Sequence, residues 1–347
     1  MDSLITIGTK TDKKPYSEHR WITDLIFYES PILSLFKGSR DQDYFYYWCE
    51  NDIIVNRWLV IPVGREDIER YLAGEVSLYS LVNKNRSVAV LDMNKEGEPT
   101  FVFMVPTEQL PYTYIPPETS FFDADLCPSE SYKYLISELY VIDIDKRWFF
   151  DEFSQFEKLF TQLYSFVYTV DNAGGIVSSE RVQSAFSQYP WRGGFSAVNF
   201  YQDLRKTVPS LHEPEVKFIE YHSPGEIKLE LLAPVAEATG RILNAIFDNR
   251  VALKGIYNDA HSYLRNSGLL KIDGPADAPV HLTDVTKNRI LEYFQILARE
   301  MNLVGYADSI WELSQNPLIA IKILLSFYRR AEKLNRFQEV GKLSFPR

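Results

Sequence analysis

The spacing of apolar and polar residues changes character about one third of the way along the chain. Up to about Pro106, short runs rich in β-branched and aromatic residues alternate with turn-forming stretches, a pattern typical of strands. One short helix is expected over Glu66–Leu72. Together these segments predict a small antiparallel β domain over 21–106, or a partly closed barrel. The expected strands are Leu25–Tyr28, Tyr44–Cys49, Arg57–Val63, Ser87–Met93 and Phe101–Val105.

Polar and proline-rich stretches flank this predicted β domain. Residues 1–20 are polar and are expected to form a flexible tail. Five prolines fall between Pro106 and Pro128, which opposes regular structure, so residues 107–128 are expected to be a linker. Aromatic residues within that linker predict that it packs on a surface.

Beyond residue 129, apolar residues recur at three- and four-residue intervals, which predicts helices. The pattern near the middle reads α-β-β-α, as in a ferredoxin-like two-layer unit. The sequence therefore predicts an α+β fold, with an α+β domain over 129–250 and a helical C-terminal region over 251–347. The expected elements of the α+β domain are a strand at 132–143, helices at 148–170 and 196–206, strands at 216–221 and 226–231, and a helix from Pro234.

Charge and cysteine content narrow the function classes. The 347 residues carry a net charge of −10, which argues against a protein that coats nucleic acid without sequence preference. Residues 1–128 hold 12 basic and 20 acidic residues, whereas 129–347 hold 25 and 27, so only the C-terminal part tolerates phosphate locally.

The two cysteines, Cys49 and Cys127, fit a reducing compartment. With no signal-peptide pattern and no run of 18 apolar residues, a cytoplasmic protein without a membrane partner is expected.

Two groups of segments resemble bacterial proteins without an assigned activity. Arg57–Val63, followed by Tyr71–Gly74 and Ser77-Leu78, resembles the opening of an uncharacterised bacterial domain of unknown function. Trp191–Phe195 and Ile219–Gly225, with its Ser-Pro-Gly turn, resemble segments of bacterial proteins of which some are associated with phage defence. The resemblance implies a bacterial cytosolic protein and supplies no catalytic residues.

Four acidic and basic residues are candidates for metal-dependent phosphodiester chemistry. Glu226 and Lys228 form an acid-x-Lys pattern on a predicted strand, in which the acid would bind a divalent cation and the lysine would steady water or phosphate. Asp143 and Asp145 project to one side of a strand end and could share Mg²⁺. For the first pair, the favoured alternative is an ordinary half-buried strand with Glu226, Lys228 and Glu230 on its polar face. For the two aspartates, it is a turn in which they accept backbone hydrogen bonds.

A glycine-containing loop and the last helix are candidates for binding anions. Arg192, Gly193, Gly194 and Ser196 precede a helix, where free amides and a guanidinium favour an anion; the alternative is an ordinary N-cap by Ser196. The helix that begins at Asn316-Pro317 is predicted to bury Ile321, Leu324, Leu325, Tyr328 and Ala331. The basic residues of this helix are expected to share one face, which binds a partner protein or nucleic acid. The alternative is an ordinary solvated helix face. These residues are Lys322, Arg329, Arg330, Lys333 and Arg336.

No convergent catalytic set occurs in the sequence, and the five histidines are scattered. The chain is therefore interpreted as a non-enzymatic protein-binding or regulatory subunit of a bacterial cytosolic assembly, in line with the phage-defence resemblance, with no cofactor and no metal. A metal-dependent nuclease or phosphohydrolase, and a nucleic-acid sensor that uses the C-terminal basic helix, stand as alternatives. The sequence leaves the oligomeric state and the identity of the partner open.

Overall fold

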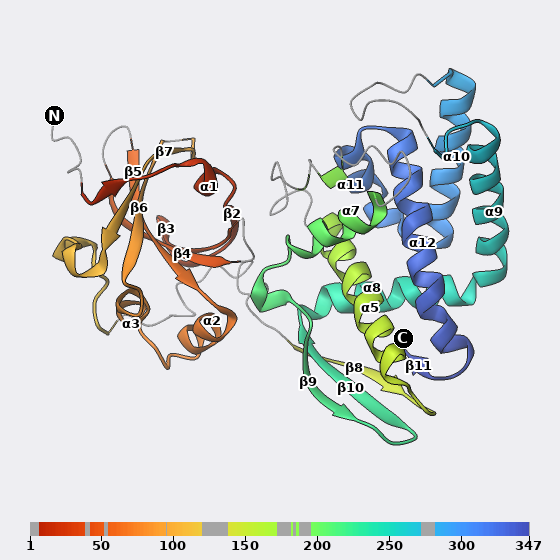
Figure 1. Cartoon of the computed structure of the whole chain (residues 1–347), viewed down its shortest axis with the longest axis horizontal. Helices are drawn as coiled ribbons and strands as arrows, with labels where there is room; N and C mark the ends of the chain where they lie inside the picture. The colour runs from red at the N-terminus through yellow and green to blue at the C-terminus, as the bar shows by residue number, and fades with distance from the viewer. Residues whose placement is uncertain are drawn as a thin grey trace. The chain divides into compact units, whose positions relative to one another are not determined.

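The computed structural model describes residues 7–38, 42–51, 55–94, 96–119, 138–171, 182, 185–186, 196–271 and 282–346. The chain divides into two compact units (Figure 1). Unit 1 comprises residues 1–137 and the segment Pro209–His212, and unit 2 comprises 138–208 and 213–347. Antiparallel strands dominate the N-terminal half and helices the C-terminal half, which confirms the α+β prediction.

Unit 1 is built on one seven-stranded sheet of order β1-β7-β6-β5-β4-β3-β2, in which every pairing is antiparallel. Each of the five expected strands corresponds to one of its strands. β3 was not predicted, because Pro31 and Ser34 interrupt its apolar run. The strands are β1 (Thr9–Lys10), β2 (Arg20–Tyr28), β3 (Ser30–Lys37), β4 (Asp43–Asn51), β5 (Val55–Val63), β6 (Ser87–Asn94) and β7 (Pro99–Pro106). Two helices follow β5 in the chain: α2 (Arg65–Leu72), where one was expected, and α3 (Leu78–Asn83).

Part of the expected flexible tail is ordered. Strand β1 pairs with β7, with Thr9 opposite Met104, and it is followed by helix α1 (Lys14–Ser17). The His19 ring lies 4.4 Å from the Tyr44 ring centre in a stacked arrangement, and its Nδ1 is 2.8 Å from the Tyr46 hydroxyl. Burial lowers the pKa of His19 to about 4, so the imidazole is neutral near pH 7. The polar composition did not indicate this order, because strand pairing, ring stacking and the packing of Tyr16 against the core of the sheet hold the segment.

A buried ion pair lies in the centre of the unit 1 sheet. Arg57 on β5 and Asp92 on β6 occupy opposite positions, and two parallel bonds of 2.6 and 2.8 Å join guanidinium to carboxylate. Arg57 also donates to the Tyr114 hydroxyl at 3.0 Å, and that hydroxyl donates to Glu50 at 2.5 Å. Burial alone would lower the pKa of Arg57, but the hydrogen bonds to Asp92 and Tyr114 raise it above the ordinary value.

The start of the expected linker is therefore anchored to the sheet. Tyr114 belongs to the 3₁₀ turn η2 (Tyr112–Tyr114), which follows η1 (Thr107–Gln109), and only 4% of it is exposed. The rest of the expected linker, from residue 120, lies outside the described residues.

The short segment Pro209–His212 joins unit 1 through polar contacts. The Ser210 amide donates to Asp43 Oδ2 at 3.0 Å, and the Ser210 hydroxyl donates to the same oxygen. Arg65 donates to the Ser210 carbonyl at 3.3 Å, and the other Asp43 oxygen lies 3.4 Å from Lys37 Nζ. Asp43 thus holds a turn (η4, Ser210–His212) that is distant from it in sequence.

Unit 2 combines a four-stranded antiparallel sheet of order β11-β8-β10-β9 with a layer of helices (Figure 1). Along β10 buried and half-buried residues alternate, so Ile227, Leu229 and Leu231 face the core while Glu226, Lys228 and Glu230 form the polar face, as the sequence indicates. The strands are β8 (Glu138–Ile144), β9 (Glu215–Glu220), β10 (Gly225–Leu231) and β11 (Leu343–Ser344). The helices are α5 (Phe150–Asp171), α7 (Ser196–Arg205), α8 (Ala233–Asp248), α9 (Arg250–Asn266), α10 (Asp284–Glu300), α11 (Val304–Ser314) and α12 (Pro317–Glu339).

Helix α12 runs through the middle of the helical layer and packs on α5, α8, α9, α10 and α11 (Figure 1). The Asn316 side chain caps it by accepting from the amides of Leu318 and Ile319, as the Asn-Pro signal predicts. The expected buried side is confirmed, and from Ala320 to Tyr328 every residue is buried. Among the helices that the structure describes, none combines the length and the apolar content needed to cross a bilayer.

Asp92→Leu is expected to lower the free energy of unfolding of unit 1 by about 3–5 kcal/mol, because it leaves the Arg57 charge buried without its carboxylate. The double variant Arg57→Met/Asp92→Leu should recover most of that loss, since it strands no charge. Urea denaturation followed by tryptophan fluorescence compares the two. A double variant as unstable as the single one would show that packing, rather than charge, decides the effect.

The stability of unit 1 should fall as the pH drops from about 6.5 to 4. In that window an unfolded His19 takes up a proton, whereas the folded one, with its pKa lowered to about 4, does not. The unfolded state binds more protons there, so the free energy of unfolding decreases, by about 2–3 kcal/mol. His19→Asn keeps a polar group near the Tyr46 hydroxyl but cannot titrate, and its denaturation midpoint should depend less on pH. Parallel pH curves for the two proteins would contradict this role.

Candidate anion-binding groove

Three helices of unit 2 surround a groove of about 820 Å³. Side chains of α5, α9 and α12 line it, and five of them are basic while two are acidic. In a chain with a net charge of −10, this is a local positive site. The basic residues are Lys158 on α5, Lys254 on α9, and Arg329, Arg330 and Lys333 on α12; the acidic ones are Asp151 and Glu332.

The packing of α12 explains where its cations lie. Because the helix is buried on all sides up to Tyr328, exposed charge begins only at Arg329. Arg329 and Lys333 lie one turn apart and both are exposed. Lys158 and Lys254 are exposed on the facing helices. None of these four side chains forms an ion pair within the described residues, so all four charges are available to a ligand.

Arg330 is held in a fixed position at the wall of the groove. Its Nε donates to Gln162 of α5 at 2.8 Å, and its Nη1 donates to the Ser326 hydroxyl at 2.7 Å. The guanidinium carbon lies 3.8 Å from the centre of the Tyr201 ring, a cation–π contact. Burial lowers the pKa of Arg330, and burial also raises the pKa of Tyr201 to about 12. Arg330 therefore contributes a preoriented charge, whereas Arg329 and Lys333 contribute exposed side chains without an ion pair among the described residues.

Two tyrosines form an aromatic wall in the same groove. The Tyr257 ring lies 5.0 Å from that of Tyr328 and is stacked on that of His261 at 5.7 Å. Tyr328 is buried, which raises its pKa to about 12, while Tyr257 is half-buried. Burial, together with the nearby cations Arg265 and Arg329, lowers the pKa of His261. The groove thus offers cations beside a partly accessible ring.

Two of the basic residues predicted on α12 lie elsewhere. Lys322 is 6% exposed and its Nζ donates to the Leu270 carbonyl at 3.4 Å, so the expectation of an exposed basic face that includes Lys322 is wrong. The reason is that α12 is buried around its whole circumference at that level. Arg336 is exposed and pairs with Glu332 one turn earlier at 3.2 Å, outside the lining of the groove.

The sheet of unit 2 brings three of the four candidate catalytic residues together. Asp143 on β8 lies directly opposite Glu226 on β10, and Lys228 is two residues further along the same polar face. Lys228 Nζ is 2.7 Å from Glu226 Oε1. Asp145 lies beyond the strand, where it accepts from the Lys146 amide at 2.7 Å and from the Ser223 hydroxyl. The Ser223 bond, then the Lys146 amide, lower the pKa of Asp145, as expected for a turn aspartate.

Of the four loop candidates for anion binding, one belongs to a described helix. Arg192, Gly193 and Gly194 lie outside the described residues. Ser196 is the first residue of α7, and the structure describes only its backbone.

Sequence reasoning identified Arg329, Arg330 and Lys333 but missed Lys158, Lys254 and Tyr257 of the same groove. Each lies on a helix whose polar side carries other charges, so nothing in its local pattern marks it. The fold brings together positions about 70 to 175 residues apart, which a charge pattern along one helix cannot indicate.

Comparison with protein-family models, with curated proteins and with solved structures finds no match for this chain.

Proposed function

We propose that the chain is a non-enzymatic binding protein whose helical unit receives an acidic segment of a partner protein in the basic groove. The observation that carries this proposal is the convergence of five cations from three helices on one groove in an acidic chain. A preoriented arginine beside exposed cations recognises carboxylates through charge-assisted hydrogen bonds. The cytosolic setting, expected from composition and from the resemblance, and the association with phage defence, which the resemblance implies, stay predictions.

An acidic peptide fits the groove better than a nucleic acid does. The groove carries three net positive charges, while the whole chain is at −10 and repels a long polyanion at a distance. A short acidic segment needs only the local complement of charge. Tyr257, which could stack on a base, is half-buried beside Tyr328 and His261. Single-stranded nucleic acid is therefore the competing outcome of the test.

The full chain should bind a fluorescein-labelled deca-glutamate peptide with an affinity that decreases as salt rises. Arg329→Glu/Lys333→Glu should weaken binding by about tenfold or more, because two attractive contacts become repulsive. Fluorescence anisotropy measures both. The control Lys287→Glu/Arg299→Glu makes the same charge change at exposed positions of α10 and should leave the affinity unchanged. Tighter, groove-dependent binding of an oligothymidylate would overturn the peptide proposal, and an equal loss in the control would show only a net-charge effect.

A second candidate, divalent-metal-dependent phosphodiester cleavage, is favoured by the register that sets Asp143 opposite Glu226, with Lys228 beside it. On this candidate the chain cleaves DNA or RNA when Mg²⁺ or Mn²⁺ is present. Glu226→Gln and Lys228→Met should each reduce the rate by about a hundredfold. Glu230→Gln, further along the same polar face, is the matched control and should keep the rate. Inactive wild-type protein, or equal activity in all variants, would remove the candidate.

A further inference from the structure

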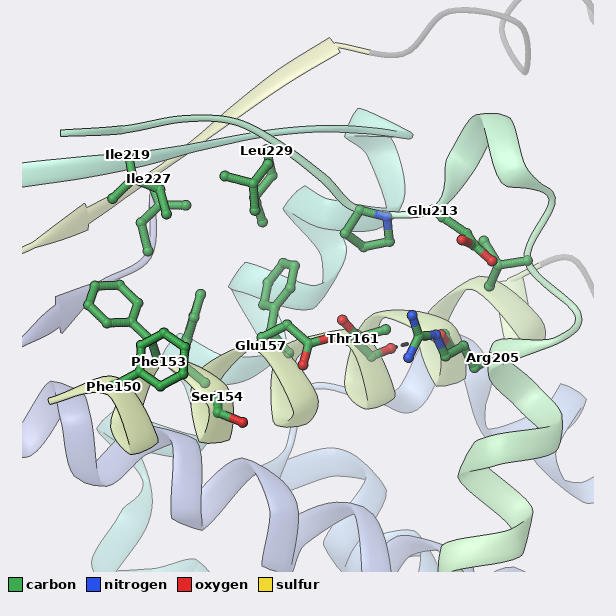
Figure 2. Close-up of a pocket in the computed structure, with 16 residues that line it drawn as sticks. Phe150, Phe153, Ser154, Glu157, Thr161, Arg205, Glu213, Ile219, Ile227 and Leu229 are labelled. Carbon is green, nitrogen blue, oxygen red and sulfur yellow. Dashed lines mark hydrogen bonds between the residues drawn. The ribbon is translucent and has the colours of Figure 1, made fainter. Parts of the chain in front are cut away.

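A second cavity, of about 340 Å³, lies on another side of α5 from the groove, between that helix and the β9–β10 hairpin (Figure 2). Phenylalanines of the first half of α5, among them Phe153 and Phe160, form one wall, and Ile227 and Leu229 of β10 form the opposite one. Its size and its mostly apolar lining are those of a small-molecule site.

This cavity opens at the edge of the sheet. β9 is the last strand in the order of the sheet, and Val216 and Ile219, which line the cavity, are 52% and 46% exposed. Phe150, at the start of α5, also lines it and is 92% exposed. Side chains of this kind are costly to leave in water, so an apolar ligand that enters here removes exposed apolar surface.

Arg205 and Glu213 lie at one end of the cavity, whereas Ser154 and Glu157 lie on α5 nearer Phe153 (Figure 2). Arg205, the last residue of α7, lines the cavity, and Figure 2 shows it at the opposite end from Phe150 and Phe153. The Arg205 side chain is exposed and forms no ion pair or hydrogen bond with any described residue. Glu157 and Glu213 also line the cavity, and Glu157 lies on α5 between Phe153 and Thr161 (Figure 2). An anionic group is therefore favoured in contact with Arg205 and disfavoured next to Glu157 and Glu213.

We propose that this cavity binds an amphipathic monocarboxylate, an unbranched aliphatic acid whose carboxylate pairs with Arg205 and whose chain runs between α5 and the hairpin toward Phe150. Burial of each methylene contributes about 0.8 kcal/mol, and the planar guanidinium matches a carboxylate with two parallel hydrogen bonds. The inference concerns a site separate from the basic groove and goes beyond the function proposed above.

Titration calorimetry of the full chain with decanoate and with decanol, both below their aggregation limits, tests the proposal. Decanoate should bind at least about tenfold more tightly than decanol, because only the acid pairs with Arg205. Arg205→Met should abolish that preference. Glu157→Gln should tighten decanoate binding by removing a like charge. Equal binding of the two compounds by the wild type, or a preference that persists in Arg205→Met, would overturn the carboxylate assignment.

Two further variants locate the bound ligand. Ile219→Trp fills the mouth of the cavity at an exposed position, so binding of both compounds should be lost while the far-ultraviolet circular dichroism stays that of the wild type. Arg329→Glu/Lys333→Glu, which alters only the basic groove, should bind decanoate as the wild type does. Unchanged binding in Ile219→Trp, or its loss in the groove variant, would place the ligand elsewhere and reject the proposal. Because the groove variant also tests the peptide, failure of one proposal can be told from failure of the other.

Discussion

The burial of helix α12 is the constraint on which the rest of unit 2 depends. Five other helices pack on it, so its residues from Ala320 to Tyr328 are enclosed on every side and must be apolar, or have their polar groups satisfied internally. Lys322 meets this requirement by donating to a carbonyl. Exposed charge occurs on α12 only beyond Tyr328, and three of the five cations of the helix, Arg329, Arg330 and Lys333, line the groove.

Unit 1 solves a similar problem with a different interaction. Its sheet buries the Arg57–Asp92 pair, and the Tyr114 hydroxyl that completes the network comes from the turn beyond the last strand. A buried pair of this kind adds little net stability compared with apolar residues, but it penalises any alternative pairing that separates the two charges. The network therefore favours one register between β5 and β6 and one position for the following turn.

The sequence predicted elements better than it predicted sites, for physical reasons. Alternation along Gly225–Leu231 and the three-to-four spacing in α5 report on burial of single elements, and both agree with the structure. The prediction of a single basic face on α12 failed at Lys322 because it assumes that a helix has one solvent-facing side. The juxtaposition of Asp143 with Glu226 depends on strand register, and that of Lys254 with Arg329 on how helices pack. Neither is encoded in local spacing, so these sites became visible only once the fold was known.

Helix α5 contributes one wall to each of two cavities, and Ser154 lines both. If a ligand in one cavity shifts or stiffens this helix and thereby changes the affinity of the other cavity for its ligand, the second ligand must change the affinity of the first cavity by the same factor. This helix of 22 residues is the element through which such a dependence would act, without any contact between the two ligands. The effect of a substitution on α5 on the binding of one ligand is consequently ambiguous by itself. Only a thermodynamic cycle, in which the affinity for each ligand is measured with and without the other, separates loss of a direct contact from coupling.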